Sequence, residues 1–412
     1  MSDPADPGLR VVIAGAGHAG GAVAAMLRQF GHAGPITLIG EEPVPPYQRP
    51  PLSKAWLKGE ADAESVALKP AGFYADSRID LRTGHRVARI ARGRREVELW
   101  SGEAIPYDRL ILATGMRPNR LSLPGADLKG VHTLRTLVDA DALKAELGPG
   151  KRLAIIGGGY IGLEVAGSAR ALGASVVVLE RESRLLARSA CQVLSSFFQT
   201  AHEAEGVAFR LGAAVSGFVG EAGRVTGVAL ADGEVIACDV VLVGVGSTPN
   251  LEIAAEAGLD VDGGVLVDAD ARTSDPEVFA IGDVSRRPVP IYGRMFRLES
   301  VPSALEQARQ AVHAITGRPA PPAETPWNWS DQYDLKLQMA GLAVDADHVL
   351  VRGDPATRRF AVFHLQGNRI QAVEAINAPA EFMMGRQLIG SRAEVSRDRL
   401  ADPSRSMKEA PV

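Results

Sequence analysis

Cysteine is scarce in this sequence, and its scarcity excludes several kinds of protein. Only Cys191 and Cys238 occur among the 412 residues, and they lie far apart. A disulfide scaffold is therefore excluded, and the two cysteines lack the spacing of a metal-binding or redox pair. None of the eight histidines is followed by another four residues later. We therefore predict no metal site, and we expect two reduced, buried thiols in a cytoplasmic protein.

An excess of positive charge and long apolar runs are also lacking. The formal net charge is −4, so no broad basic surface favours nucleic acid as a partner. No apolar run is long enough to span a bilayer, so we expect no membrane partner either. The first residues, MSDPADPG, lack the charged and apolar regions of a signal peptide, and we expect a short disordered lead-in.

The overall composition is that of an ordinary globular protein. Hydrophobic residues make up 46% of the chain and charged residues 23%. A chain of 412 residues is too long for one compact core. We therefore predict two to three domains.

A glycine-rich stretch near the N-terminus, VVIAGAGHAG, predicts a nucleotide site. A strand over 11–14 leads into a G-x-G-x-x-G turn, a helix over about 20–30 that stops at Gly31, and a second strand over 36–39. The turn is formed by Gly15, Gly17 and Gly20, and the acid Glu41 follows the second strand.

The same pattern occurs again in AIIGGGYIGLE. A strand over 153–156, a helix to about Leu172 that stops at Gly173, and a strand over 175–179 frame the second copy. Its turn is formed by Gly157, Gly159 and Gly162, and its acid is Glu180. In both copies the acid follows the last glycine by about 20 residues, as a Rossmann βαβ unit requires.

Each glycine in such a turn has a separate physical role. The first allows the tight turn, the second lets a pyrophosphate approach the backbone, and the third lets helix and strand pack closely. The dipole of the helix that follows contributes only about 0.3–1 kcal/mol, so direct N–H hydrogen bonds must provide most of the affinity. The alternative is a glycine-rich turn that merely packs well, which two complete copies make a poor explanation.

Glu180 indicates which nicotinamide nucleotide the second unit binds. A carboxylate at this strand end accepts hydrogen bonds from the adenosine ribose hydroxyls of NADH. A 2′-phosphate would meet like charge, at a cost of about 4 kcal/mol per unit charge at about 4 Å and an effective dielectric constant near 20. We expect this repulsion to outweigh help from Arg181 and Arg184, which by themselves would favour NADPH.

Two further stretches indicate how the domains are connected. LILATGMRPN ends at Asn119 and VLVGVGSTPN ends at Asn250, and each is an apolar strand that breaks into a Gly-x-x-Pro-Asn turn. We interpret them as two crossings between domains, with residues 116–246 inserted in a first domain made of 9–115 and 247–325. Residues 326–412 follow a proline-rich linker and predict an α+β domain of antiparallel strands, a helix near 380–390 and a loose last dozen residues.

Several motifs together resemble one family. They are the N-terminal GAGHAG, YQRPPLSK (47–54), ATG (113–115), GGGYIGLE, AIGD (280–283), LESV (298–301) and WNWSDQ (327–332). The chain resembles the FAD-dependent pyridine nucleotide oxidoreductases, and within them the NADH-dependent ferredoxin reductases of bacterial cytochrome P450 and aromatic-ring dioxygenase systems. The match covers about 9–395, and RPPLSK together with WSDQ is far more specific than the glycine turns.

The resemblance implies a fold and two cofactors. The fold is α/β and glutathione-reductase-like, with two Rossmann-like dinucleotide-binding domains, the second inserted in the first, and a C-terminal α+β domain. The first domain would bind FAD and the inserted one NADH. The implied FAD-binding residues are Gly15, Gly17, Gly20, Glu41, Arg49, Lys54, Val87, Thr114, Gly115, Asp283 and Val301. The implied NADH-binding residues are Gly157, Gly159, Gly162 and Glu180.

Asp283 and the start of the helix that follows Val301 carry open alternatives or departures from the family. By composition alone, Asp283 could be only a turn residue or helix cap, whereas the resemblance places it at the ribityl chain of FAD. Pro302 suits the first turn of a helix whose positive end would face the flavin, and the alternative is an ordinary surface helix. The family often has asparagine where Ser303 stands, and Pro302 occupies a variable position.

The resemblance also implies the residues closest to the chemistry. We predict that Lys54 and Glu164 pair across the two domains at the nicotinamide, where the alternative for Glu164 is an acid favourably placed at a helix N-terminus. Tyr160 would cover the flavin until NADH displaces it, or it is a plain packing aromatic. Trp329 would lie between the flavin and a docked ferredoxin, or it is a core tryptophan.

The expected partner is a [2Fe–2S] ferredoxin. A group of arginines follows Asp283 and would form a basic rim that steers an acidic ferredoxin, unless it is an ordinary solvated loop. These arginines are Arg286, Arg287, Arg294 and Arg297. The resemblance implies a monomer or weak dimer.

Two other functions stay open at this stage. A disulfide or peroxide reductase shares the plan but needs a redox cysteine close to the flavin, and Cys191 and Cys238 fall inside the inserted domain. An NADH-sensing interaction protein resembling apoptosis-inducing factor would be reduced slowly and signal through its shape. Turnover with a small ferredoxin separates the enzyme from the sensor.

Overall fold

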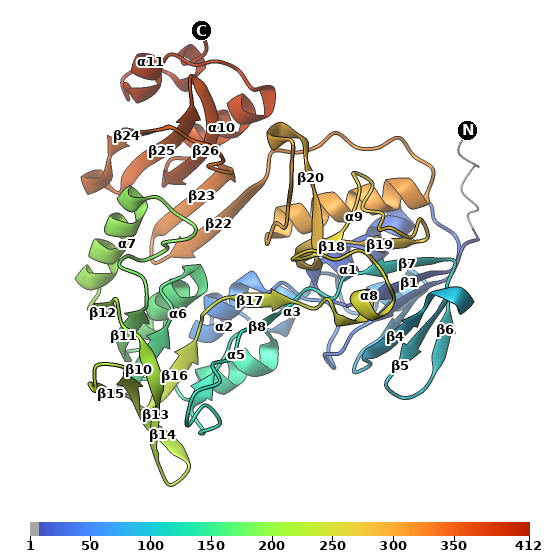
Figure 1. The fold of residues 1–412 in the computed structure, drawn as a ribbon, viewed down its shortest axis with the longest axis horizontal. Helices are drawn as coiled ribbons and strands as arrows, with labels where there is room; N and C mark the ends of the chain where they lie inside the picture. The colour runs from blue at the N-terminus through green and yellow to red at the C-terminus, as the bar shows by residue number, and fades with distance from the viewer. Residues whose placement is uncertain (1–7) are drawn as a thin grey trace.

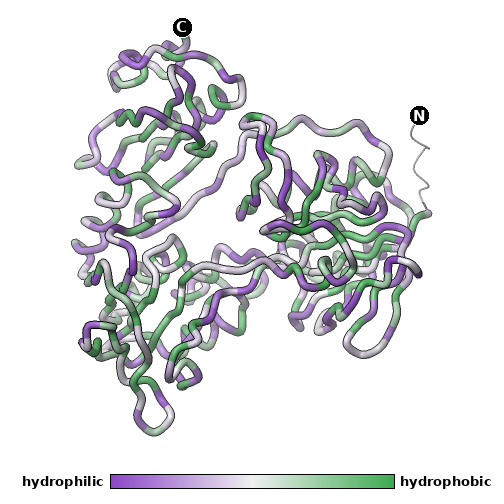
Figure 2. Tube along the Cα trace, viewed as in Figure 1, coloured by the Kyte–Doolittle hydropathy of each residue, from purple (hydrophilic) through white to green (hydrophobic). Residues whose placement is uncertain are grey.

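A computed structural model describes residues 8–412 (Figure 1). The lead-in that we expected to be disordered lies, apart from Gly8, outside the described residues. The described residues form three units, each built on a five-stranded sheet with helices packed on it. The apolar residues concentrate along the strands of the sheets (Figure 2).

The first unit is built on a five-stranded parallel sheet. The sheet has the order β19-β7-β1-β2-β3 and comprises β1 (Val11–Ala14), β2 (Ile36–Ile39), β3 (Ile79–Arg82), β7 (Arg109–Leu112) and β19 (Val278–Ala280). Side chains alternate across β1, so Val11 and Ile13 face one core cluster and Val12 and Ala14 face another.

Different layers cover the two faces of this sheet. Helices α1 (His18–Gln29) and α9 (Val301–Ile315) pack on one face. A three-stranded antiparallel sheet of β4 (Val87–Ala91), β5 (Glu96–Leu99) and β6 (Ala104–Pro106) packs on the other. Both faces of the parallel strands are therefore buried, which explains their continuous apolar sequences.

The second unit repeats this plan. Its parallel sheet has the order β12-β11-β10-β16-β9, and its strands are β9 (Val131–His132), β10 (Arg152–Ile156), β11 (Ser175–Glu180), β12 (Val207–Leu211) and β16 (Val240–Val243). Helix α6 (Tyr160–Ala171) packs on one face, and a sheet of β13 (Val215–Glu221), β14 (Arg224–Leu230) and β15 (Val235–Ala237) packs on the other. Helix α7 (Gln192–Ala204) lies between β11 and β12 in the chain.

The two crossings between these units pair with each other. Strand β8 (Met116–Pro118) and strand β17 (Ser247–Pro249) form an antiparallel ribbon between the units, with Arg117 opposite Thr248 (Figure 1). All strands of the second sheet lie between β8 and β17 in sequence, so the second unit is inserted in the first. The domain boundaries at 116, 247 and 326 stay a prediction.

The C-terminal unit is an antiparallel sheet with helices. The sheet has the order β22-β23-β26-β25-β24 and comprises β22 (Trp327–Gln332), β23 (Leu335–Gly341), β24 (His348–Asp354), β25 (Arg359–Gln366) and β26 (Arg369–Ile376). Helix α10 (Pro379–Ser391) occupies the predicted position, and α11 (Arg397–Ala401) follows. Strand β23 packs against α7 of the second unit, where Leu335 and Leu337 share a core cluster with Leu194 and Phe198. Figure 1 shows the C-terminal sheet next to the second unit.

The expectation of a loose C-terminus is wrong. Met407 and Ala410 are buried in the core of the C-terminal unit, and Val395 forms a β-bridge with Pro411. Most residues of this segment are polar, but its few apolar side chains anchor it to the core of the C-terminal unit.

Shorter elements connect these layers. They are α2 (Ala55–Lys58), α3 (Ala63–Val66), α4 (Phe73–Asp76), α5 (Leu137–Lys144), α8 (Glu252–Glu256), β18 (Val265–Leu266), β20 (Ser285–Val289) and β21 (Arg294–Phe296). Among residues 8–412, none of the helices combines the length and the apolar character that crossing a membrane requires.

Candidate functional site: two nucleotide cradles and the junction between them

The first glycine turn has the shape of a pyrophosphate cradle. Gly15 has a φ of 117°, and a Cβ on it would collide with the carbonyl oxygen of Ala113. A Cβ on Gly20 would collide with the carbonyl oxygen of Gly15. A Cβ on Gly17 would meet only the Arg49 guanidinium, at 3.9 Å. The first and third glycines are thus required by the fold, whereas the second faces open space.

The second turn repeats this division of roles. Gly157 has a φ of 108°, and its Cβ would collide with the carbonyl oxygen of Gly244, while a Cβ on Gly162 would collide with that of Gly157. A Cβ on Gly159 would meet no described atom within 4 Å. The space in front of Gly159 is what the close approach of a pyrophosphate to the helix N-terminus needs.

Glu180 lies where a ribose-binding acid belongs. At the end of β11, its carboxylate accepts hydrogen bonds from the backbone N–H groups of Gly158 at 2.6 Å and Glu182 at 2.8 Å. Arg184 donates instead to the carbonyls of Ala187 and Ala190, and Arg181 is exposed beside Glu182. The acid is therefore fixed at the turn and Arg184 is engaged elsewhere, which favours NADH over NADPH.

The acid of the first cradle is more exposed than its counterpart. The Glu41 side chain is 70% exposed and reaches only Arg86, at 3.5 Å. Its neighbour Glu42 is held more firmly, because it accepts hydrogen bonds from the Tyr47 hydroxyl at 2.6 Å and from Arg49 at 2.7 Å. Glu41 is thus free to bind a ribose, and Arg49 is positioned by Glu42.

Unpartnered polar atoms mark the rest of the first cradle. The His18 Nδ1 and Arg135 Nε atoms are buried and have no hydrogen-bond partner among the described residues. Burial lowers the pKa of His18, with a further contribution from Arg49 and opposition from Asp283. Arg135 donates to the Asp283 carboxylate at 3.2 Å. A polar cofactor on this surface would supply the missing partners, so the residues present fit FAD.

The remaining predicted FAD contacts lie around the domain crossings and at α9. Thr114 and Asn250 exchange two hydrogen bonds, of 3.1 and 2.8 Å, directly beside Gly115, which has a φ of 61°. Val87 opens β4 and packs on the adjoining core, and Val301 is the first residue of α9.

Ser303 is part of a buried polar cluster at the start of α9. Ser300 is the N-cap residue of α9, and its side chain accepts from the Ser303 backbone N–H at 3.2 Å. The Ser303 hydroxyl accepts from the Gln307 side chain at 3.1 Å. The serine that stands where the family often has asparagine is therefore held within α9.

The structure contains the predicted pair between Lys54 and Glu164. The Lys54 Nζ lies 2.5 Å from the Glu164 Oε2, and Glu164 is only 7% exposed. Ser53 also donates to Oε2, at 2.5 Å, and Ser330 donates to Oε1, at 2.7 Å. The carboxylate is therefore fully engaged by residues from the first unit and from the C-terminal sheet.

This junction continues into a buried chain of hydrogen bonds. Gln332 donates to the Ser330 hydroxyl at 3.1 Å, and its side-chain oxygen lies 2.8 Å from the His202 Nε2. The other ring nitrogen of His202 lies 3.0 Å from the Tyr333 hydroxyl. One tautomer satisfies both contacts, with Nε2–H donating to Gln332 and Nδ1 accepting from Tyr333.

Sequence reasoning missed Ser53, Ser330 and Gln332. A signal existed in WNWSDQ, because side chains alternate along a strand and place Ser330 and Gln332 on one face. The spacing of residues along the strand does not indicate that this face would contact Glu164.

Tyr160 and Trp329 occupy different environments. The Tyr160 hydroxyl donates to the Ser189 carbonyl at 3.2 Å and lies 3.1 Å from the Met339 sulfur. These are the contacts of a packing aromatic, so its role as a flavin cover stays a prediction. Trp329 is half-buried, lies 5.7 Å from the ring of Trp327 and lines a cavity of about 550 Å³ on β22 and β23.

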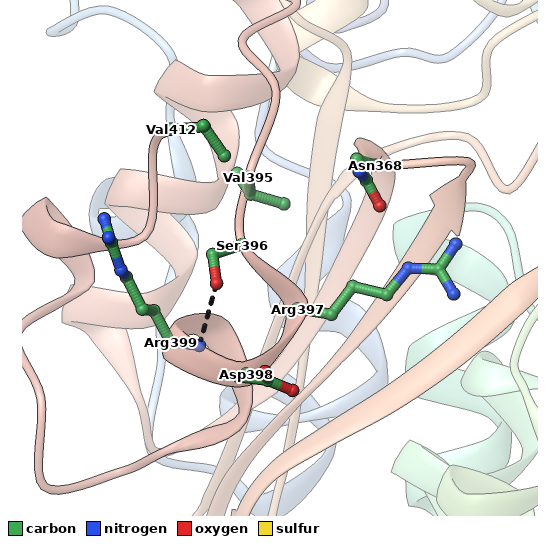
Figure 3. Close-up of a pocket in the computed structure, with 7 residues that line it drawn as sticks. All are labelled: Asn368, Val395, Ser396, Arg397, Asp398, Arg399 and Val412. Carbon is green, nitrogen blue, oxygen red and sulfur yellow. Dashed lines mark hydrogen bonds between the residues drawn. The ribbon is translucent and has the colours of Figure 1, made fainter.

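A second pocket, of about 430 Å³, belongs to the end of the chain (Figure 3). It is lined by α11 and its neighbours, where the Ser396 hydroxyl accepts from the backbone N–H of Arg399 at 3.4 Å. None of the predicted site residues lines it.

The predicted basic rim needs one correction. Arg287 is only 4% exposed and pairs with Glu306, which is 3% exposed, at 2.5 Å. It is a buried structural ion pair and cannot contact a partner. The other arginines are partly neutralised: Arg286 pairs with Asp262, Arg294 with Asp345 at 2.6 Å, and Arg297 with Glu299 at 2.7 Å.

The cysteines do not support a sulfur mechanism. Cys238 is buried, whereas Cys191 is only half-buried, which differs from the expectation for the latter. Burial raises the pKa of Cys191 to about 12 and that of Cys238 to about 11, so both are protonated and poorly nucleophilic at neutral pH.

Comparison with known proteins identifies the class to which this geometry belongs. Residues 9–308 match the pyridine nucleotide-disulphide oxidoreductase family and residues 327–411 match the reductase C-terminal family. The chain belongs to the pyridine nucleotide-disulphide oxidoreductases.

Its individual relatives are reductases of similar length. A probable ferredoxin reductase of Castellaniella defragrans is 51% identical, with 96% of this chain and 97% of the relative covered. The crystal structure of the covalent putidaredoxin reductase–putidaredoxin complex matches with a TM-score of 0.95 at 42% identity, covering 97% of both chains. The ferredoxin reductase for the CYP199A2 system of Rhodopseudomonas palustris matches with a TM-score of 0.94 at 42% identity, covering 98% of this chain and all of the other.

These similarities confirm several predictions made from the sequence. The family, the fold class, the pair of cofactors FAD and NAD(H), and the class of enzyme are as expected. The roles of individual site residues, the docking residues and the oligomeric state stay predictions.

Proposed function

We propose that this protein takes hydride from NADH onto FAD and passes single electrons to a [2Fe–2S] ferredoxin that serves a cytochrome P450 or a ring-hydroxylating oxygenase. The observation that carries the proposal is the junction at Glu164, where residues of the first unit, the inserted unit and the C-terminal sheet meet. The similarity to ferredoxin reductases of closely matching length supports it.

The chain's own residues bind and orient the two nucleotides. The turns at Gly17 and Gly159 give two pyrophosphates access to backbone N–H groups, and Glu180 holds the adenosine ribose of NADH. Bound FAD supplies the chemistry, since it accepts two electrons as hydride and gives them up one at a time. Orientation of the nicotinamide against it is the protein's contribution.

Lys54 and Glu164 define the place where the two nucleotides meet. Glu164 holds the Lys54 ammonium on a buried carboxylate that Ser53 and Ser330 also fix. A charged pair in this place can align the carboxamide and ribose of a nicotinamide by hydrogen bonds. Lys54 and Glu164 act in this account as binding and orienting groups.

The partner is proposed to dock at Trp329 and at the three exposed or half-buried arginines nearby in the chain, Arg286, Arg294 and Arg297. Trp329 lines an open cavity rather than the core. A ferredoxin docked in this way brings its cluster to the C-terminal sheet that contacts Glu164 through Ser330. A monomer or weak dimer in the cytoplasm fits this role.

The test is reduction of a panel of [2Fe–2S] ferredoxins by the FAD-loaded protein with NADH and with NADPH. We expect rapid reduction of at least one ferredoxin, with NADH preferred. A long-lived reduced flavin and poor turnover with every ferredoxin would favour the NADH-sensing interaction protein instead. Activity that disappears in the double variant Cys191→Ser and Cys238→Ser would favour a disulfide or peroxide reductase.

A further inference from the structure

We propose that Cys191, His364 and Glu374 form a zinc site that links the inserted unit to the C-terminal sheet. The Cys191 sulfur, a His364 ring nitrogen and a Glu374 carboxylate oxygen all lie within 4.8 Å of one another. The residues are 10 to 183 positions apart in the sequence, which is why no spacing pattern reveals them.

The site combines elements of two different units. Cys191 is the N-cap residue of α7, and His364 and Glu374 lie on the neighbouring strands β25 and β26. Glu374 is in register with Val362, so it is the diagonal neighbour of His364 on one face of the sheet. The His364 Nε2 lies 2.8 Å from the Glu374 Oε2, and both residues are buried, at 7% and 6% exposure.

The three ligand types favour zinc over calcium and magnesium. Thiolate, imidazole and carboxylate together suit a borderline-soft ion, whereas calcium and magnesium require oxygen ligands throughout. Zinc with three protein ligands is tetrahedral and keeps one position for water. The ion replaces the proton of the Cys191 thiol, as zinc does in cysteine sites generally.

The surroundings connect the site to the second glycine turn. Met339 is opposite Glu374 in register on β23, and its sulfur lies 3.1 Å from the Tyr160 hydroxyl. That hydroxyl also donates to the carbonyl of Ser189, two residues before Cys191. A zinc ion on Cys191 would therefore fix the segment against which Tyr160, the first residue of α6, is packed.

The competing explanation is a buried hydrogen bond between His364 and Glu374 beside a thiol that only fills space. The two explanations differ in what the cysteine does when metal is supplied. A filler thiol makes no bond to an added ion, whereas a ligand thiolate gives a sulfur-to-cobalt charge-transfer absorption when cobalt replaces zinc.

The experiment uses the full-length, FAD-loaded protein after treatment with a chelator. Zinc is titrated by calorimetry and in competition with a chromophoric chelator, and cobalt is titrated in parallel by absorption spectroscopy. We expect one equivalent to bind, and Cys191→Ser and His364→Gln to weaken binding at least about ten-fold. Cys238→Ser, which removes the other thiol, is the matched control and should bind as the unaltered protein does.

Three results of the titrations would overturn the proposal. Absence of saturable binding at one equivalent, or undiminished affinity in both variants, would mean an adventitious ion only. Should the variants lose FAD or fold poorly, the cobalt spectrum of the unaltered protein decides alone. Cobalt bound without a sulfur charge-transfer band would contradict ligation by Cys191.

Discussion

At the scale of single residues, we predict that Glu180 determines which nicotinamide nucleotide the protein prefers. Its carboxylate is held by two backbone N–H groups at the second glycine turn, where the 2′ position of an adenosine ribose would lie. Repulsion of a 2′-phosphate at about 4 Å costs about 4 kcal/mol per unit charge at an effective dielectric constant near 20.

The substitution Glu180→Gln removes this repulsion while keeping the size of the side chain. We expect the ratio of kcat/KM for NADPH to that for NADH to rise at least ten-fold, about 1.4 kcal/mol of discrimination. Steady-state kinetics with both nucleotides checks this. Glu182→Gln, on the same loop, should leave the ratio unchanged, and an equal change in both variants would exclude a specific role for Glu180.

Glu164 is the residue on which the junction depends. Its two oxygens accept from Ser53, Lys54 and Ser330, so the substitution Glu164→Gln removes the charge that holds the Lys54 ammonium. We expect the rate of flavin reduction by NADH to fall at least ten-fold, about 1.4 kcal/mol of barrier, in stopped-flow measurements.

The matched control is Glu203→Gln, at an exposed position on α7. It should reduce the flavin at the normal rate. FAD content measured by absorption should be the same in both variants. A normal reduction rate in Glu164→Gln would reject the proposed role of the pair at the nicotinamide.

At the scale of elements, the strand–turn–helix unit shows how one glycine can serve the ligand and another the fold. A Cβ at residue 159 meets no described atom within 4 Å, whereas one at residue 162 collides with the Gly157 carbonyl. Gly159→Ala should therefore fold with little loss of stability but raise KM for NADH at least ten-fold. Gly162→Ala should lose about 1–3 kcal/mol of folding free energy through overpacking.

Thermal unfolding and NADH kinetics on the two variants separate these effects. The reverse pattern, with Gly159→Ala unstable and Gly162→Ala merely weak in binding, would contradict the assigned roles. The comparison is well matched because both residues stand in the same turn and receive the same methyl group.

The elements that could be predicted from the sequence are those with local causes. The strand over 11–14 and the one over 36–39 coincide with β1 and β2, and β10 and β11 extend the predicted 153–156 and 175–179 by one residue each. Glycine turns, helix stops and apolar runs specify these elements without help from distant residues.

What could not be predicted depends on contacts between distant segments. Ser330 meets Glu164 across 166 residues of chain, and Arg287 is buried because Glu306 on α9 neutralises it. A run of arginines looks like a basic surface in sequence, since the sequence does not show which of them face inward. The burial of Met407 near the C-terminus could not be predicted for the same reason.

At the scale of the whole molecule, the surface proposed for the ferredoxin combines Trp329 with Arg286, Arg294 and Arg297. The arginines proposed to form that surface are each paired with an acid, so their net field is weaker than their number suggests. Electrostatic steering should therefore be modest and sensitive to salt.

Charge reversal tests the surface directly. The triple variant Arg286→Glu, Arg294→Glu and Arg297→Glu should raise KM for ferredoxin at least about five-fold through slower association, with no change in the reduction of ferricyanide by NADH. Arg120→Glu, at an exposed arginine in the inserted unit, is the control. Equal losses with both acceptors would reject docking at these arginines.

The central claim is that two adenine dinucleotides bind so that electrons arrive as a pair and leave singly. Anaerobic absorption spectroscopy of the purified protein, supplied with FAD if necessary, tests it most directly. We predict a yellow protein whose flavin absorption is bleached by one equivalent of NADH and restored by two equivalents of an oxidised [2Fe–2S] ferredoxin. A protein that stays colourless with added FAD, or whose flavin NADH does not bleach, would contradict the account.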